Sequence, residues 1–266
     1  METQKMDENY SIKSLHRAIQ VLKVFTSEKS ALSLTEINQL TKITKPSLQR
    51  ILSTLVYEGL LTKDEESKKY KLGIELYFLG NLVQKDAHLL NISLPVMEDI
   101  HNKTGEAILL SARYRDLRRV IANINSNHVL TANQFVGDTS PLYIGASGKI
   151  LLAYQTEEEI DEFFQKTKLE KINSNTIIDV KLIKKELVKI RENNYAYSSG
   201  ERLKGVSSIT TPIFNRFSEI VAAISIIIPD SRLEDYNQEQ LITMMQDAAN
   251  SISEKLSKKM LSVKID

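Results

Sequence analysis

The sequence predicts an α+β fold in which a winged helix-turn-helix precedes an antiparallel sheet flanked by helices. Two observations support the first part: residues 33–72 read as two short helices, a tight turn and a charged hairpin, and positive charge gathers there. A third supports the second part. From residue 93 onward, short apolar runs between polar turns alternate with amphipathic segments, as in a helix-flanked sheet.

The segment 33–43 carries the start signal of a short helix. Ser33, followed three residues later by Glu36, has the spacing of a capping box, in which each side chain satisfies a backbone N–H of the first turn. The apolar residues that follow share one helical face: Leu34, Ile37 and Leu40. Ile43 then stands alone among polar residues, and we expect it to pack between this helix and the next one.

A second helix is expected from Thr44 to Gly59. Thr44 is a suitable N-cap, Pro46 falls in the first turn, where its missing N–H costs nothing, and Gly59 suits a left-handed C-terminal cap. The core-facing stripe consists of Leu48, Ile51, Leu52 and Leu55. The other face is polar, and residues of these types reach phosphates and base edges when such a helix enters the major groove.

Beyond Gly59, residues 60–63 and 68–72 are expected to pair as a lysine-bearing hairpin, or wing. Residues 11–72 hold eleven Lys or Arg and six Asp or Glu, a net charge of +5, whereas the whole chain is +1. Such segregation is typical of a surface that neutralises phosphates. The candidate DNA-binding residues are Thr44, Lys45, Ser47, Gln49, Arg50, Ser53, Lys63, Lys68 and Lys69. The alternative is an ordinary helical hairpin with a solvated, lysine-rich face.

Length and composition set further bounds. The 266 residues suggest two domains, and without cysteine the chain has neither disulfides nor thiolate metal sites. Its four histidines lack the spacing of a helical metal site, so we expect no metal and no cofactor. No apolar run is long enough to span a membrane, and the polar N-terminus is unlike a signal peptide, so a cytoplasmic location is expected.

We expect a DNA-binding domain over residues 11–73, a linker helix over 74–92 and a second domain over 93–261. A helix over 14–25 completes the first domain, and the apolar stripe of the linker suggests dimerisation. In the second domain, the expected strands are 107–112, 119–124, 129–133, 207–214 and 220–229. The first expected helix of this domain ends near residue 104, and a short helix follows the glycine-bearing segment 137–149. Three more helices are expected over residues 157–164, 179–191 and 238–261.

Four blocks of the sequence together resemble the IclR family of bacterial transcriptional regulators: IKSLHRAIQVLKVF, SLTEINQLTKITKPSLQRILSTLVYEGLL, PLYIGASGKILLA and NNYAYSSGERLKGVSSITTPIFNRFSEIVAAISIIIP. The resemblance covers nearly the whole chain. It implies that the second domain is GAF-like and binds a small molecule, often an organic acid, which alters operator affinity. It also implies binding to double-stranded operator DNA as a homodimer or a dimer of dimers. We expect a repressor, with an activator as the alternative.

The resemblance also implies where the effector binds: Gly145, Ala146, Ser198, Ser208, Ser225 and Ile227. The backbone amides of the first two would face an anion at a helix N-terminus. Acid-sensing members tend to have an acidic residue, a cysteine and two serines at the other four positions, of which only Ser225 is retained in kind. This departure favours a ligand with some apolar surface, or no small ligand. The alternative is that Ser198, Ser208 and Ser225 are ordinary strand and loop serines without a role in ligand binding.

Enzymatic readings have weaker support. GASGKI at 145–150 lacks the GxxxxGK spacing of a phosphate-binding loop, and no GxSxG nucleophile elbow occurs. The acidic run 157–162 opens a helix, where negative charge favours the dipole, and is expected to be solvated. The sequence thus predicts a regulator without catalytic residues. A metabolite-binding module or enzyme with an incidental helical N-terminus is the alternative.

Overall fold

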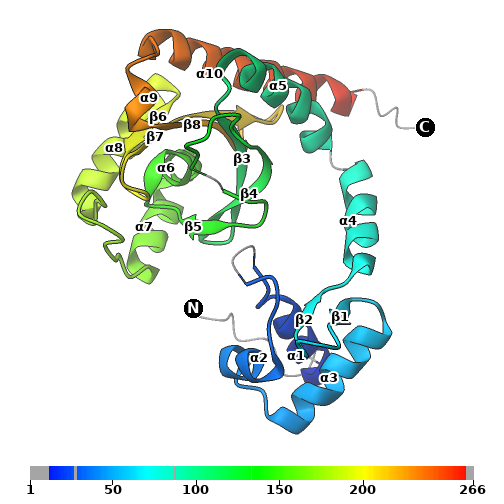
Figure 1. The fold of residues 1–266 in the computed structure, drawn as a ribbon. Coiled ribbons are helices and arrows are strands. Elements are labelled where there is room, and N and C mark those ends of the chain that lie inside the picture. Colours follow the sequence, from blue (N-terminus) through cyan, green and yellow to red (C-terminus); the bar gives the residue numbers. More distant parts are fainter. Residues whose placement is uncertain (1–11, 27–28, 87, 133, 262–266) are drawn as a thin grey trace. The chain divides into compact units, whose positions relative to one another are not determined.

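The computed structural model describes residues 12–26, 29–86, 88–132 and 134–261. The chain divides into two units, residues 1–86 and 87–266. Figure 1 draws the first unit in blue to cyan and the second in green to red. The division falls inside the segment 74–92 that the sequence predicts as one linker helix, because one helix ends at Asp86 and another begins at His88.

The first unit is a winged helix-turn-helix, as predicted. Its elements are α1 (Lys13–Leu22), α2 (Leu34–Thr41), α3 (Lys45–Tyr57), β1 (Leu61–Lys63), β2 (Tyr70–Leu72) and α4 (Ile74–Asp86). The capping box is present: the Ser33 backbone N–H donates to the Glu36 carboxylate at 2.7 Å, and the Glu36 N–H donates to Ser33 Oγ at 3.3 Å. Residue 11, the predicted start of the domain, lies outside the described residues.

A small apolar core holds the first unit together. The predicted stripe residues Leu48, Leu52 and Leu55 are buried with Ile37, and Ile43 is only 5% exposed, as its isolated position predicted. The sharp turn between α2 and α3 is made at Lys42, whose φ of 58° is left-handed. The Asn38 side chain braces this turn by donating to the Ile43 carbonyl at 2.5 Å.

The second unit is built on a 6-stranded sheet of order β5-β4-β3-β8-β7-β6, with antiparallel neighbours throughout. The strands are β3 (Ala107–Tyr114), β4 (Leu117–Ile124), β5 (Thr139–Pro141), β6 (Ala196–Ser199), β7 (Val206–Phe214) and β8 (Ile220–Pro229). The helices are α5 (His88–Thr104), α6 (Gly145–Ala153), α7 (Glu157–Lys166), α8 (Val180–Asn193), α9 (Asp230–Leu233) and α10 (Gln238–Leu261). The predicted α+β class is confirmed.

Helices cover the two faces of this sheet in different ways (Figure 1). On one face, α5 and α10 pack together, and Met97 and Met245 meet the strand residues Ile224 and Ile226. On the other face, α6 lies against β7 and β8 and is backed by α7 and α8. The face under α6 therefore holds the segments that the sequence predicts to surround a ligand.

Several details differ from the sequence prediction. The predicted strand 129–133 does not form: residues 129–132 are irregular, Val129 is fully exposed, and residue 133 lies outside the described residues. Part of the β4 edge pairs instead with β5, a three-residue strand that ends in Pro141. Proline is tolerated there because β5 lies at the edge of the sheet. The short edge strand β6 was not predicted, and α1 ends at Leu22 although Phe25 is buried as expected.

Every helix in the described ranges is too short or too polar to cross a membrane.

Candidate functional site

The exposed face of α3 carries the predicted polar residues. Lys45, Gln49, Arg50 and Ser53 are exposed, and Ser47 is half-buried. Thr44 is the N-cap residue, as predicted, but its hydroxyl makes no capping hydrogen bond among the described residues. The buried stripe on the opposite side fixes the rotation of the helix, so these polar groups all face away from the core.

The β1–β2 hairpin presents the predicted lysines beside this helix. Lys63, Lys68 and Lys69 are exposed. The turn is closed by Asp64, which accepts hydrogen bonds from the backbone and hydroxyl of Ser67, and these bonds hold the pKa of Asp64 below its usual value. Lys68 pairs with Glu65 at 3.1 Å. Because this pair is exposed, little free energy opposes an exchange of Glu65 for a phosphate.

The second candidate site is a small pocket at the N-terminus of α6. Five of the six predicted effector residues line it: Gly145, Ala146, Ser198, Ser208 and Ile227. The chain itself satisfies the two α6 amides, since Gly145 N–H donates to Glu201 Oε2 and Ala146 N–H donates to Ser198 Oγ, each at 3.1 Å. The prediction that these amides face a ligand stays a prediction.

Ser225 is placed differently from the other five. It is fully buried in β8, and its hydroxyl is hydrogen-bonded to Thr210 Oγ1 at 2.8 Å. Ser225 lies two residues before Ile227 on the same face of the strand, yet it is not among the residues that line the pocket. In this structure its hydroxyl forms a hydrogen bond between the paired strands β7 and β8.

A buried ionic group that the sequence analysis missed supports the α6 end of the pocket. Lys149 is 2% exposed, and its ammonium lies 2.5 Å from Glu186 Oε2 and 2.8 Å from Glu201 Oε1. Glu201 thus links the buried lysine to the first amide of α6. The three residues come from α6, α8 and the loop after β6, so their proximity depends on the tertiary fold.

Two arginines also line the pocket, and the sequence did not predict them either. Arg118 of β4 is 1% exposed, and Arg202 follows β6 and is half-buried. Both donate to Gln134 Oε1. Burial lowers the pKa of Arg118 to about 10, with the charge of Arg202 as a second cause, and burial also lowers the pKa of Arg202. Both pKa values fall because these cations are poorly solvated.

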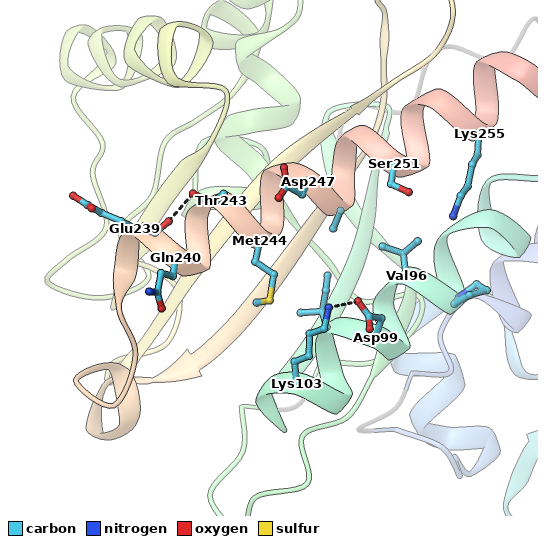
Figure 2. Close-up of a pocket in the computed structure, with 13 residues that line it drawn as sticks. Val96, Asp99, Lys103, Glu239, Gln240, Thr243, Met244, Asp247, Ser251 and Lys255 are labelled. Carbon is cyan, nitrogen blue, oxygen red and sulfur yellow. Dashed lines mark hydrogen bonds and ion pairs between the residues drawn. The ribbon is translucent and has the colours of Figure 1, made fainter.

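A larger groove of about 810 Å³ lies between α5 and α10. Figure 2 shows its walls, with Asp99 and Lys103 of α5 paired across one helical turn and Met244 of α10 pointing toward them. The α6 pocket is far smaller, at about 40 Å³. Buried charges and hydrogen-bonding side chains converge on the small pocket, whereas the groove is an open surface of mixed polarity.

Among the described residues, no cluster of three or more His, Asp or Glu side chains could hold a metal ion. An exposed polar helix with a lysine-bearing wing, followed by a sheet domain with a polar pocket, defines a two-domain winged-helix transcriptional regulator.

Comparison with known protein families supports the assignment as a transcriptional regulator. A model described as the IclR helix-turn-helix domain matches residues 14–65, and one described as bacterial transcriptional regulator IclR C-terminal matches residues 82–254. The second match alone spans more than half of the chain. The chain therefore belongs to the IclR family and is a DNA-binding transcriptional regulator.

Among curated relatives, the transcriptional regulator KipR of Bacillus subtilis is 30% identical over 92% of this chain and 97% of its own length. The DNA-binding transcriptional repressor YiaJ of Escherichia coli is 25% identical over 91% of this chain and 87% of its own. Because these relatives are transcriptional regulators, the comparison favours a regulator over the alternative of an enzyme with an incidental helical N-terminus.

Solved structures share the fold. An IclR regulator from Alicyclobacillus acidocaldarius superposes with a TM-score of 0.85 at 25% identity, covering 93% of this chain and 100% of that one. An IclR homologue from Microbacterium hydrocarbonoxydans, complexed with 4-hydroxybenzoate, superposes with a TM-score of 0.81 at 21% identity, covering 91% and 98%.

Proposed function

We propose that this protein binds operator DNA as a homodimer and represses neighbouring genes until a small molecule in the α6 pocket changes its affinity for that DNA. In this proposal, residues 11–73 bind DNA and residues 93–261 bind the effector. Residues 74–92 connect these two domains. The observation that carries the proposal is the exposed polar face of α3 beside a lysine-bearing hairpin. Relatives named as repressors support the direction of regulation.

On DNA, α3 enters the major groove. Gln49 and Arg50 reach base edges, because amide and guanidinium groups form paired hydrogen bonds with adenine and guanine. The groups that contact the phosphate backbone are Thr44, Lys45, Ser47, Ser53, Lys63, Lys68 and Lys69. Phosphate contacts fix the position of the protein, while contacts with the base edges choose the sequence.

Two copies of the chain associate through apolar side chains that the first unit leaves exposed. On α4, Tyr77, Phe78 and Leu82 are 64%, 54% and 63% exposed. On α1, Leu15 and Ile19 are 56% and 41% exposed. So much exposed apolar and aromatic surface on one small domain is typical of a protein interface. A two-fold dimer contacts repeated half-sites of an operator.

In the second unit, the effector occupies the pocket lined by Gly145, Ala146, Ser198, Ser208 and Ile227. Ser225 does not line the pocket, and its hydrogen bond to Thr210 connects β8 to β7, the two strands that carry Ile227 and Ser208. The pocket joins α6 to β6, β7 and β8, so a ligand there contacts both the helix and the sheet. The 4-hydroxybenzoate bound by one structural relative makes aromatic acids a suitable first set of test compounds.

The test uses a labelled DNA fragment from upstream of the gene for this protein, titrated with the full chain at several salt concentrations. We expect tight binding at low salt and a linear fall of log K with log salt, because each neutralised phosphate releases counterions. A metabolite panel added to the complex should contain a compound that shifts the affinity. Absence of binding to every genomic fragment at low salt would contradict the DNA-binding role.

A further inference from the structure

We infer that the tip of the β3–β4 hairpin in the second unit contacts the phosphate backbone of the DNA that flanks the operator, through Arg115 and Arg119. The inference rests on the DNA-binding function of the first unit. It adds a second DNA contact, outside both the winged helix and the α6 pocket.

Arg115 occupies a backbone position that is costly for an arginine. Tyr114 and Leu117 pair across the hairpin, so Arg115 and Asp116 form a two-residue turn. The φ of Arg115 is 58°, in the left-handed region where such turns usually have Gly, Asn or Asp. Arg113 holds the turn by donating from Nε to the Arg115 carbonyl at 2.9 Å. Backbone preference therefore does not explain an arginine here, and its side chain is exposed to a partner.

Arg119 is fixed in place without being satisfied by hydrogen bonds. Its guanidinium carbon lies 3.8 Å from the centre of the Tyr114 ring, and that of Arg115 lies 5.6 Å from the same centre. Among the described residues, the buried Nε of Arg119 has no hydrogen-bond partner, and no carboxylate lies within 4 Å of either guanidinium. A stacked guanidinium still offers its outer N–H groups to phosphate oxygens in pairs. Two cations on one ring thus form a compact surface for an anion.

Positive charge gathers at this hairpin although the second unit as a whole is slightly acidic. Residues 87–266 hold 22 Lys or Arg and 23 Asp or Glu, whereas residues 111–120 hold four arginines and one aspartate. Arg118 is buried in the α6 pocket, and Arg113 pairs with Glu159 at 3.4 Å, which leaves Arg115 and Arg119 for a partner. The same kind of segregation distinguishes the winged-helix segment, and it favours a polyanion.

The hairpin tip lies at the end of the second unit where the chain arrives from the DNA-binding unit. Only two residues separate the end of α5 from β3, and the two elements pack together, so β3 runs back along α5. Eight strand residues span about 26 Å and seventeen helical residues about 25 Å, which places Tyr114 near the start of α5. Because the chain is a DNA-binding regulator, duplex DNA is favoured over an acidic protein as the polyanion.

The test measures binding of the full chain to a short and a long DNA fragment by fluorescence anisotropy at several salt concentrations. The short fragment is the shortest upstream sequence that the double variant Arg115→Asn/Arg119→Gln binds with full affinity. The long fragment adds about 20 bp of random sequence, roughly two helical turns, at each end. The wild type should bind the long fragment more tightly than the short one, and the double variant should bind both alike.

Each single variant should lower the slope of log K against log salt on the long fragment by about one per protomer, because each removes one phosphate contact. At about 0.1 M salt, each lost contact should weaken binding to the long fragment about 5- to 10-fold. Arg216→Gln is the matched control, since Arg216 is also exposed and stacked on an aromatic ring, 4.6 Å from the centre of Phe217. It should leave binding to both fragments unchanged.

Thermal unfolding separates DNA contact from folding. Asparagine adopts a left-handed backbone more readily than arginine, so Arg115→Asn should raise the melting temperature of the DNA-free protein while it weakens binding to the long fragment. A melting temperature that falls together with the affinity would show that Arg115 stabilises the turn, and would overturn its role as a DNA contact.

The inference is overturned if the variants lose equal affinity on both fragments, or if the salt slope on the long fragment does not change. It is also overturned if the double variant sediments differently from the wild type, because the hairpin would then join copies of the chain. Competition by inorganic phosphate at constant ionic strength, specific to the long fragment, would assign the site to a small phosphate ligand instead. A wild type that binds no fragment contradicts the DNA-binding function itself, whereas unchanged variants on DNA that the wild type binds contradict this inference alone.

Discussion

Single side chains on the exposed face of α3 and on the wing have different predicted roles. Gln49 projects from the first half of α3, and Lys68 lies on the hairpin, where it pairs with the exposed Glu65. Gln49→Ala should lose about 1–3 kcal/mol of preference for the operator over random DNA, the value of one good base contact. Lys68→Ala should weaken all DNA alike and reduce the salt slope by about one.

Fluorescence anisotropy with operator and scrambled fragments at three salt concentrations measures both quantities. Lys171→Ala, which removes an exposed lysine from the second unit, controls for net charge and should change neither. Equal losses on operator and scrambled DNA for both Gln49→Ala and Lys68→Ala contradict the assigned roles.

At the residue scale, helical spacing identified the exposed residues of α3, whereas neither spacing nor family resemblance identified the buried arginines of the pocket. Gln49 follows from helical spacing alone, because Leu48 and Leu52 define the buried face. Arg118, Gln134 and Arg202 lie 16 and 68 residues apart along the chain, and no periodic pattern joins them. Only the pairing of β4 with β5 and the return of the chain after β6 bring them together.

At the scale of elements, the capping box of α2 has a predictable pH dependence. Hydrogen bonds from the Ser33 backbone, and then from its hydroxyl, hold the pKa of Glu36 below its usual 4.5. A depressed carboxylate pKa contributes stability that is present above the unfolded pKa and is lost as the pH falls through the folded value. Glu36→Gln should therefore lower the melting temperature at pH 7, and the difference from the wild type should shrink below about pH 4.5.

Thermal unfolding of both proteins between pH 3 and 7 measures this difference. Glu58→Gln removes another exposed carboxylate of the same unit and separates the capping effect from the change in net charge. A difference between Glu36→Gln and wild type that stays constant down to pH 3 would rule out the capping role.

The junction between the wing and α4 depends on a close backbone approach. A Cβ atom on Gly73 would lie 1.9 Å from the carbonyl oxygen of Gly59, which itself has a left-handed φ of 70°. Gly73→Ala should therefore force the hairpin apart and cost about 1–3 kcal/mol, the usual range for overpacking. Gly80→Ala is the matched control, because a Cβ there meets nothing within 4 Å and alanine favours the helix by about 1 kcal/mol.

Chemical denaturation measures both glycine variants. The prediction fails if Gly73→Ala is as stable as the wild type, or if Gly80→Ala is destabilised to the same degree.

Short edge strands explain where element prediction failed. Apolar alternation suggested a strand at 129–133, but Val129 and Leu130 face solvent and give no sheet face to bury. The strands that do form at the two edges, β5 and β6, have only 3 and 4 residues and are rich in hydroxyls. Periodicity needs more residues than this to be recognised, whereas α2, α3 and α10 each carried cap or stripe signals over several turns.

At the scale of the whole molecule, we expect the proposed dimerisation to determine how tightly the regulator binds an operator. Phe78 and Leu82 lie four residues apart on α4 and are 54% and 63% exposed. Phe78→Glu with Leu82→Lys should convert the dimer to a monomer, because charges replace the apolar contacts. Since the second half-site then no longer binds intramolecularly, operator affinity should fall by about 10²- to 10⁴-fold, while affinity for a single half-site should remain. Analytical ultracentrifugation and anisotropy on full and half operators measure both effects. Val129→Glu replaces a fully exposed apolar residue of the second unit and should change neither. A double variant that sediments as the wild type does and keeps full operator affinity would show that α4 is not the dimer contact.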